Sequence, residues 1–332
     1  MKMYERIIAK NIIVHLTRNQ LFNKNQHGFI PGKSTQSQLL MYYKDIYESL
    51  QEGKRIDTVF LDFARAFDKV DHEILMQKII KHKIKGKLAI WLKEFLNERK
   101  FKVLANGTIS DEEDVTSGVP QGTVLAAILF LIMISDIDEK VKESIVRCFA
   151  DDTRVSKVIE CEEDPHKMQE DLNAIYEWAN NNKMKFNTDK FEYISHGEMD
   201  GVPNEAYKNP EGISIVSDDT VRDLGVICNN NLLFKEHIDN IVMKSKVMSG
   251  IILRTFTTRE RNVMLQLYST YIRSRLEYCS IVWSPSLQGD INKVERIQKS
   301  FTARIEGMEN KNYHERLKEL KCIVWKEEGS AI

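Results

Sequence analysis

The chain has 332 residues, with 48 Lys and Arg against 49 Asp and Glu, and its net charge is −1 at pH 7. This length can bury a large core in two or three subdomains, whereas the near-neutral charge is not typical of a nucleic acid-binding chain as a whole. The five cysteines are far apart and lack Cys-x-x-Cys spacing, which argues against zinc sites and a disulfide framework. We find no signal peptide and no transmembrane span, so we expect an intracellular protein, nuclear or cytoplasmic, that is not secreted and has no membrane partner.

The N-terminal segment predicts two helices separated by turns. Apolar residues near one stripe predict the first helix over residues 3–19. A stretch rich in turn-forming residues, 25–33, follows it. Thr35 and Gln38 have the spacing of a capping box, which predicts a second helix that ends near Gly53.

The apolar run 56–62 predicts a buried strand that ends at Asp62. An acid at the carboxyl end of a buried strand lies at a sheet edge, where ligands commonly gather; the alternative is a solvated acid. Asp71 is the predicted N-cap of a helix over 71–84. A further helix is predicted over 87–99, and Asn106-Gly107 after it is a good hairpin turn.

The segment 117–123, Ser-Gly-Val-Pro-Gln-Gly-Thr, predicts a loop whose backbone can approach a ligand closely. Thr123 is a plausible N-cap for the apolar helix that follows, and such a helix start suits an anionic phosphate. Gln121 offers a donor and an acceptor to a base or a ribose. The alternative is a packing loop that leads into a core helix, and the apolar run 124–134 is too short to span a bilayer.

Two apolar strand-like runs within 145–158 meet at Asp151-Asp152, which predicts a hairpin with these two aspartates as its turn. Such turns normally have Asn-Gly, Asp-Gly or Gly followed by any residue, and neighbouring carboxylates raise each other's pKa. A local rule broken without structural gain points to function. Mg²⁺ or Mn²⁺ would offset the repulsion, because hard cations prefer oxygen ligands. The alternative is a pair of ordinary solvated turn aspartates.

If the strand that ends at Asp62 pairs beside this hairpin, three carboxylates converge within reach of a metal. Two cations held by three carboxylates form a general device for phosphoryl transfer. One lowers the pKa of an attacking hydroxyl, and the other neutralises the leaving pyrophosphate. Positioning and charge then account for most of the catalysis.

The remainder of the chain predicts a helix that runs to about residue 182, with Asp164 as its N-cap and Pro165 in its first turn. A short strand at 191–196 and a loop-rich boundary at 198–220 are predicted after it. A strand pair and helices at about 235–257, 259–277 and 289–306 are predicted beyond it. Residues 221–321 contain 17 Lys and Arg against 11 Asp and Glu. This region could follow a phosphate backbone, or its cations could belong to solvated helix faces.

Three motifs in this order, FLDFARAFDKVDH (60–72), SGVPQGTVLAAILF (117–130) and FADD (149–152), resemble the catalytic blocks of reverse transcriptases. The greatest resemblance is to the non-LTR (LINE-type, jockey-like) retrotransposons. It extends over four further stretches and therefore nearly the whole chain: 26–40, 178–190, 221–239 and 267–285. The resemblance implies an α+β right-hand polymerase with an antiparallel-sheet palm, truncated fingers and a helical thumb. The implied domains are partial fingers at 1–55, a palm with the catalytic motifs at 56–200 and a thumb-like, mostly helical region at 201–332.

The resemblance implies an RNA-directed DNA polymerase that uses two Mg²⁺ ions, with Mn²⁺ as a substitute. Asp62, Asp151 and Asp152 match the metal-binding carboxylates. The implied nucleotide-binding residues are Phe63 through its carbonyl, Phe67 as a steric barrier to a 2′-hydroxyl, Gln121 with Gly122 in its loop, and Lys190 as a proton donor near the pyrophosphate. From the residues alone, Phe67 could be a core aromatic and Lys190 a surface lysine.

The implied partners are an RNA template, a DNA primer and deoxynucleoside triphosphates, and no endonuclease motif is present in this chain. Some positions depart from the family pattern. Ala126-Ala127 replaces Gly-Pro, and His196-Gly197 replaces an aromatic before glycine. The basic segment that precedes the first helix in the family is absent, so the alternative function is a catalytically inactive, nucleic acid-binding remnant of a mobile element. A gene fragment of low stability with no function is a third possibility.

Overall fold

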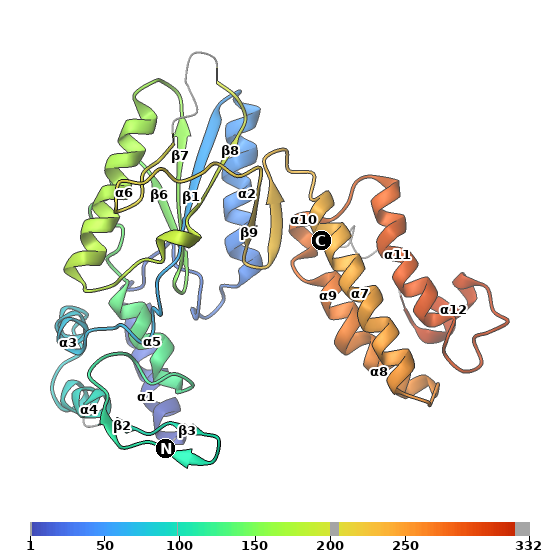
Figure 1. Ribbon diagram of the computed structural model, residues 1–332, viewed down its shortest axis with the longest axis horizontal. Coiled ribbons are helices and arrows are strands. Elements are labelled where there is room, and N and C mark those ends of the chain that lie inside the picture. The colour runs from blue at the N-terminus through green and yellow to red at the C-terminus, as the bar shows by residue number, and fades with distance from the viewer. Residues whose placement is uncertain (1, 98, 200–205, 323–332) are drawn as a thin grey trace. The chain divides into compact units, whose positions relative to one another are not determined.

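The computed structural model describes residues 2–97, 99–199 and 206–322 (Figure 1). The chain forms two compact units, residues 1–218 and 219–332. The predicted palm–thumb boundary at residue 200 lies outside the described residues, and the division between the units follows Asp218. No helix in the described part of the chain is both long and apolar enough to cross a membrane.

The first unit contains six α-helices and eight strands among its described residues. The helices are α1 (Lys2–Arg18), α2 (Thr35–Gln51), α3 (His72–Lys81), α4 (Lys87–Leu96), α5 (Val124–Met133) and α6 (Asp164–Asn181). The strands are β1 (Arg55–Leu61), β2 (Lys100–Phe101), β3 (Leu104–Ala105), β4 (Thr108–Ile109), β5 (Glu113–Asp114), β6 (Ile145–Phe149), β7 (Asp152–Ile159) and β8 (Glu192–His196).

The second unit begins with a two-stranded sheet and is otherwise helical where it is described. Its strands are β9 (Thr220–Asp223) and β10 (Val226–Asn229). Its helices are α7 (Lys235–Thr255), α8 (Arg261–Tyr268), a π-helix (Ser269–Arg273), α9 (Ser274–Glu277), α10 (Ser280–Trp283), α11 (Gln288–Thr302) and α12 (Tyr313–Leu320).

The centre of the first unit is a four-stranded antiparallel sheet in the order β6-β7-β1-β8. Helices α2 and α6 flank this sheet on its two sides (Figure 1). Because side chains alternate along a strand, Phe60 of β1 meets Tyr42 of α2, whereas Val59 belongs to the large core that includes Leu172 of α6. Strand β1 is therefore covered on both faces and paired on both edges, which fixes the position of the residue that follows it.

A buried ion pair lies within β1. The Arg55 guanidinium donates to both carboxylate oxygens of Asp57, at 2.8 and 2.6 Å. The Tyr207 hydroxyl donates to Asp57 at 2.7 Å, and the Tyr193 hydroxyl accepts from Arg55 at 3.3 Å. Arg55 is 1% exposed and Asp57 is fully buried. Buried charges are tolerated when they are paired and hydrogen-bonded, and this network ties β1 to β8 and to the segment around Tyr207.

Several local predictions are confirmed. Asp71 caps α3 by accepting from the backbone N–H groups of Glu73 and Ile74. Thr123 caps α5, and Asn106-Gly107 is the turn between β3 and β4. The helices predicted over 71–84 and 87–99 end earlier, at Lys81 and Leu96.

Three local predictions are wrong in detail. The capping box of α2 is formed by Ser34 and Ser37, one residue before Thr35 and Gln38. Asp164 is the first residue of α6, and its carboxylate accepts from the N–H groups of Glu160 and Cys161 in the preceding turn. The helix predicted over 259–277 is interrupted by the π-helix, and α12 was not predicted.

We predict that Asp57→Ala lowers the free energy of unfolding by about 3–5 kcal/mol, because it leaves the buried Arg55 guanidinium without its carboxylate. Urea denaturation measures this loss. Glu48→Ala is the matched control: its ion pair with Lys44 is exposed on both sides, and breaking it should cost less than about 0.5 kcal/mol. A similar loss in the two variants would contradict the role of the buried pair.

Candidate active site

The β6–β7 hairpin lies beside β1, but its turn differs from the prediction. Phe149 pairs with Asp152, so the two-residue turn is Ala150-Asp151, and Asp152 is the first residue of β7. Ala150 has a φ of 55°, a left-handed conformation that costs energy for a residue with a side chain. The prediction that both aspartates form the turn is therefore wrong by one residue. The shift leaves Asp151 at the tip and Asp152 on the strand.

The strained turn is stabilised by Gln26, which sequence reasoning missed. Its Oε1 accepts from the backbone N–H groups of Ala150 and Gly28, at 2.8 and 2.7 Å, and its Nε2 donates to the Ala150 carbonyl at 3.1 Å. A Cβ at Gly28 would lie 2.3 Å from the Ala150 nitrogen, so only glycine fits there. The backbone of Cys148 also bonds to Asn25 and His27. The segment 25–28 thus holds the hairpin tip.

Asp62 follows β1 directly and lies next to this hairpin. Leu61 pairs with Thr153, so Asp62 and Asp152 are the next residues along two neighbouring strands. The Asp62 carbonyl accepts from the Asn187 N–H at 2.8 Å, which fixes the backbone there. Antiparallel pairing therefore brings Asp62, Asp151 and Asp152 to one end of the sheet.

Lys190 lies among these acids. It ends a short 3₁₀-helix, Thr188–Lys190, and its Nζ donates to the Asp62 carboxylate at 2.9 Å. The hydrogen bond and the charge of Asp62 raise the Lys190 pKa, and the negative charges of Asp152 and Asp151 act in the same direction. Lys190 is therefore an ammonium group that pairs with Asp62 and lies within the electrostatic range of the other two carboxylates.

The surroundings of Asp151 disfavour its ionised form. Its partial burial raises its pKa above the ordinary carboxyl value, and the neighbouring Asp62 charge raises it further. A hydrogen bond to its own backbone N–H and the charge of Lys190 oppose this rise. A cation that binds Asp151 would favour its ionised form.

The donor set has the chemistry that a hard divalent cation prefers, because all three side chains offer carboxylate oxygens. Among the described residues, no group of three or more His, Cys, Asp and Glu side chains is already arranged to hold a metal ion. Lys190 is bonded to Asp62 instead. The residue types fit Mg²⁺ or Mn²⁺.

The two predicted aromatic residues after Asp62 both pack against other rings. Phe63 is buried and stacks on Phe186, with 4.3 Å between ring centroids. Phe67 stacks on Phe130 of α5 at 4.4 Å and meets Phe29 edge-on at 6.3 Å. Phe67 remains partly exposed. Its stacking explains its position without a ligand, although the exposed part remains available for contact.

The loop 117–123 lies along the segment that follows Phe67. Gly118 donates to the Val70 carbonyl, and Gln121 donates to the Asp68 carboxylate at 2.8 Å. Gly118 has a φ of +87°, and a Cβ there would lie 2.8 Å from the Asp68 carbonyl oxygen. Gln121 and Gly122 are exposed at the loop tip. The loop therefore lies close to the segment that follows Asp62.

The N-terminus of α5 does not offer the free N–H groups that we expected for a phosphate. The buried Glu5 carboxylate of α1 accepts from the Val124 N–H at 3.0 Å, and the Thr123 hydroxyl accepts from the Ala126 N–H. The prediction of a phosphate site at this helix start is therefore wrong. The Glu5 carboxylate, which is distant in the sequence, takes the place predicted for a phosphate and interacts with the helix dipole at the N-terminus of α5.

The antiparallel sheet with acidic residues at one end and helices against its faces has the arrangement predicted for the palm of a right-hand polymerase. The structure is similar to apo telomerase from Candida tropicalis, with a TM-score of 0.53 over 97% of this chain and 53% of that chain, at 10% identity. It is also similar to telomerase from Candida albicans in complex with a TWJ fragment of telomeric RNA, with a TM-score of 0.50 over 96% and 58% at 11% identity. These similarities confirm the predicted α+β right-hand polymerase fold.

Residues 1–228 match the family described as reverse transcriptase (RNA-dependent DNA polymerase), and the chain belongs to this family. It is 26% identical to a probable RNA-directed DNA polymerase from transposon X-element of Drosophila melanogaster, over 93% of this chain and 34% of that protein. It is 27% identical to the polymerase from mobile element jockey of the same species, over 92% and 34%. The resemblance to non-LTR retrotransposons is confirmed, and the chain spans about a third of the length of these curated relatives.

We predict that Gln26→Ala lowers the free energy of unfolding by about 2–4 kcal/mol, because it leaves buried backbone groups of Gly28 and Ala150 without partners. Gly28→Ala should be destabilising for the steric reason given above. Guanidinium denaturation measures both losses. The exposed Gln51→Ala should change the free energy by less than about 0.5 kcal/mol, and a Gln26→Ala variant as stable as this control would show that the turn needs no support.

We predict that Asp151→Asn raises the free energy of unfolding at pH 7 in EDTA. The raised Asp151 pKa means that the folded state holds its proton more tightly than the unfolded state. The ionised carboxylate therefore costs stability as the pH rises from the unfolded pKa through the folded pKa. The gain should disappear below the ordinary carboxyl pKa, where both states are protonated. Thermal unfolding from pH 3 to 8 measures it, with exposed Asp111→Asn as the control; destabilisation by Asp151→Asn at pH 7 would contradict it.

Proposed function

We propose that this chain is an RNA-directed DNA polymerase domain that adds deoxynucleotides to a primer 3′-hydroxyl opposite an RNA template. The observation that supports this activity is the grouping of Asp62, Asp151 and Asp152 at one end of the sheet beside Lys190. Carboxylates are brought together against repulsion only where the fold supports them, and here Gln26 and Gly28 do so.

In this proposal the three aspartates hold two Mg²⁺ ions, and Mn²⁺ can substitute for Mg²⁺. When bound, the ions lower the pKa of the primer hydroxyl and neutralise the leaving pyrophosphate. Asp151 would contribute a carboxylate whose pKa is raised, so that a bound cation would favour its ionised form. Asp62, which pairs with Lys190 in the structure, would offer its carboxylate to a bound ion, and Asp152 would complete the donor set.

Lys190, once released from Asp62, reaches into the same acidic end of the sheet as an ammonium group. Its Nζ carries three N–H donors and can donate to a phosphate oxygen. As negative charge develops on the leaving pyrophosphate, a proton held at this Nζ stabilises it and can be transferred to it. Lys190 therefore acts as the proposed acid of the reaction.

The neighbouring residues position the incoming nucleotide. Phe67 presents the exposed edge of a ring that is braced by Phe130, and a rigid ring beside the sugar leaves no room for a 2′-hydroxyl. Gln121 presents an amide, and Gly122 gives its loop a backbone that a ligand can approach. Phe63 is buried, so its proposed contribution is the carbonyl alone.

The proposed partners are an RNA template, a DNA primer and deoxynucleoside triphosphates. The related proteins of the X-element and jockey are described as RNA-directed DNA polymerases, and the telomerase neighbour was solved with an RNA fragment. We assign target cleavage to another domain or protein, because the sequence of this chain has no endonuclease motif.

We predict Mg²⁺-dependent primer extension on poly(A) with an oligo(dT) primer. Asp62→Asn, Asp151→Asn and Asp152→Asn should each lower the rate at least about 10³-fold, because each removes charge that the transition state requires. Incorporation of labelled deoxythymidine triphosphate over time measures the rate. The exposed Asp111→Asn, in a separate hairpin region, should retain the rate of the unsubstituted protein within about twofold.

Folded protein that incorporates no nucleotide, or an Asp151→Asn variant that retains activity, would contradict the proposal. Salt-sensitive binding to template and primer without incorporation would instead identify the inactive, nucleic acid-binding remnant. Filter binding at two salt concentrations distinguishes this outcome, because phosphate contacts weaken steeply with salt.

A further inference from the structure

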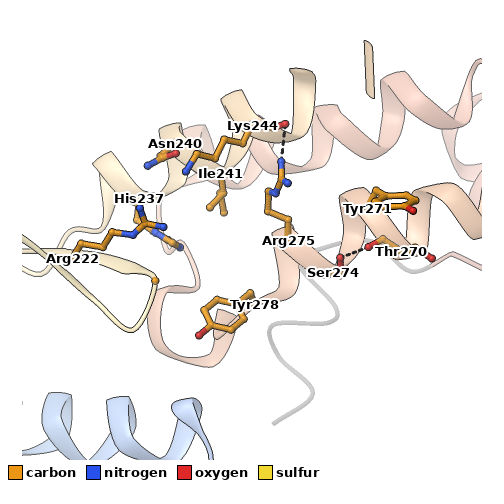
Figure 2. Close-up of a pocket in the computed structure, with 11 residues that line it drawn as sticks. Arg222, His237, Asn240, Ile241, Lys244, Thr270, Tyr271, Ser274, Arg275 and Tyr278 are labelled. Atoms are coloured by element: carbon orange, nitrogen blue, oxygen red, sulfur yellow. Dashed lines mark hydrogen bonds between the residues drawn. The ribbon is translucent and has the colours of Figure 1, made fainter. Parts of the chain in front are cut away.

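The second unit contains a cavity of about 390 Å³ that the proposed polymerase activity does not use (Figure 2). Its lining side chains come from β9, from α7 and from the segment 270–278. All of these elements belong to residues 219–332, so the cavity lies within one compact unit. Its volume is in the range of pockets that bind small molecules, which is about 300–1,000 Å³.

The cavity is strongly basic. Arg222, Lys244 and Arg275 line it, and none of its described lining residues is acidic (Figure 2). Arg275 donates one N–H to the Lys244 carbonyl at 2.9 Å, which holds its guanidinium beside α7. Cations gathered without a carboxylate repel one another, so their proximity favours an anionic ligand.

Two further groups in the cavity are buried without a hydrogen-bond partner. His237 is 3% exposed; its Nδ1 accepts from the Ile227 N–H at 3.2 Å, which places the proton of the neutral ring on Nε2. This Nε2 has no partner, and neither has the buried Oδ1 of Asn240. Burial and the charges of Arg222 and Lys244 lower the His237 pKa to about 4, so the ring is neutral at pH 7. A buried donor and acceptor without partners cost free energy unless a ligand or water satisfies them.

Aromatic rings complete the lining. Tyr271 is 50% exposed and Tyr278 is 41% exposed, and both line the cavity. The hydroxyl of Tyr278 donates to the Leu224 carbonyl at 2.8 Å, which fixes that ring. Tyr271 lies on the π-helix Ser269–Arg273, a helix type that is rare and frequent at functional sites. An exposed ring beside cations offers a stacking surface for a base.

We propose that this cavity binds one nucleoside phosphate, with the phosphate between Arg222, Lys244 and Arg275 and the base against Tyr271. The His237 Nε2–H donor and the Asn240 Oδ1 acceptor then serve the polar groups of the ligand. The nucleoside phosphate is a free mononucleotide or one nucleotide of a single strand. This site is independent of the three aspartates, and the proposal does not depend on polymerase activity.

The test uses the full chain carrying Asp151→Asn, in EDTA, so that metal-dependent binding at the aspartates is removed. Isothermal titration calorimetry measures the dissociation constants of adenosine 5′-monophosphate (AMP), adenosine and a single-stranded adenylate hexamer. Arg222→Gln and Lys244→Gln should each weaken AMP binding about 10-fold or more and leave adenosine binding nearly unchanged, because each removes a charged contact to phosphate. Tyr271→Leu should weaken all three ligands.

Matched variants separate recognition from folding. Lys246→Gln removes an exposed cation from the same helix α7 outside the cavity, and it should change AMP binding less than about twofold. His237→Asn retains an acceptor for the Ile227 N–H and removes the Nε2–H donor, so it should weaken AMP binding while thermal unfolding stays near that of the parent.

The hexamer identifies the source of the ligand. A hexamer that binds about 10-fold more tightly than AMP supports a strand segment, and equal affinities support a free mononucleotide. The proposal is wrong if AMP does not bind, if Lys246→Gln weakens it as much as Lys244→Gln, or if inorganic phosphate or phosphoserine displaces it as effectively as AMP itself.

Discussion

The mutual repulsion of three carboxylates is the constraint around which the first unit is built. Asp62 and Asp152 extend neighbouring strands, and Asp151 lies at the adjoining turn. Coulomb energy disfavours this grouping, and the Asp62 charge adds to the rise in the Asp151 pKa that partial burial causes. Cooperative pairing of β1 with both neighbours provides the rigidity that holds the group together.

Two structural features, one within β1 and one outside the sheet, hold this grouping in place. The Arg55–Asp57 network anchors the far end of β1 against Tyr193 and Tyr207, so that strand cannot shift its register without unpairing a buried charge. At the other end, Gln26 satisfies the backbone of the turn whose Ala150 has a left-handed conformation. The contacts at both ends of the sheet thus stabilise the positions of the three acids.

The sequence predicts most of the fold because its strong signals are local or carried by motifs. Apolar runs identify β1 and α5, Asp71 and Thr123 identify helix starts, and the order of the three motifs identifies the palm. The turn of the acidic hairpin is off by one residue because a positive φ at Ala150 is not an intrinsic preference of alanine. It is imposed by Gln26, more than 120 residues away in the sequence.

Long-range contacts also explain why the predicted phosphate site at α5 is wrong. Thr123 and two glycines have the local pattern of an anion-binding loop, but Glu5 of α1 supplies the anion from within the chain. Nothing in the residues 117–123 indicates this partner. Glu5 is visible in the sequence only as an acid on a mainly apolar helix face, a signal that can suggest a buried partner without naming it.

Net charge is a poor guide to what this chain binds, because its charges are segregated. A total of −1 is compatible both with an acidic group on the first unit and with a basic cavity on the second. Arg222 and Lys244 are exposed, and no described residue that lines the cavity carries an acid to offset their charges. Whether a surface attracts an anion or a cation therefore depends on the charges within about a Debye length, roughly 8–10 Å. The net charge of the whole chain does not determine it.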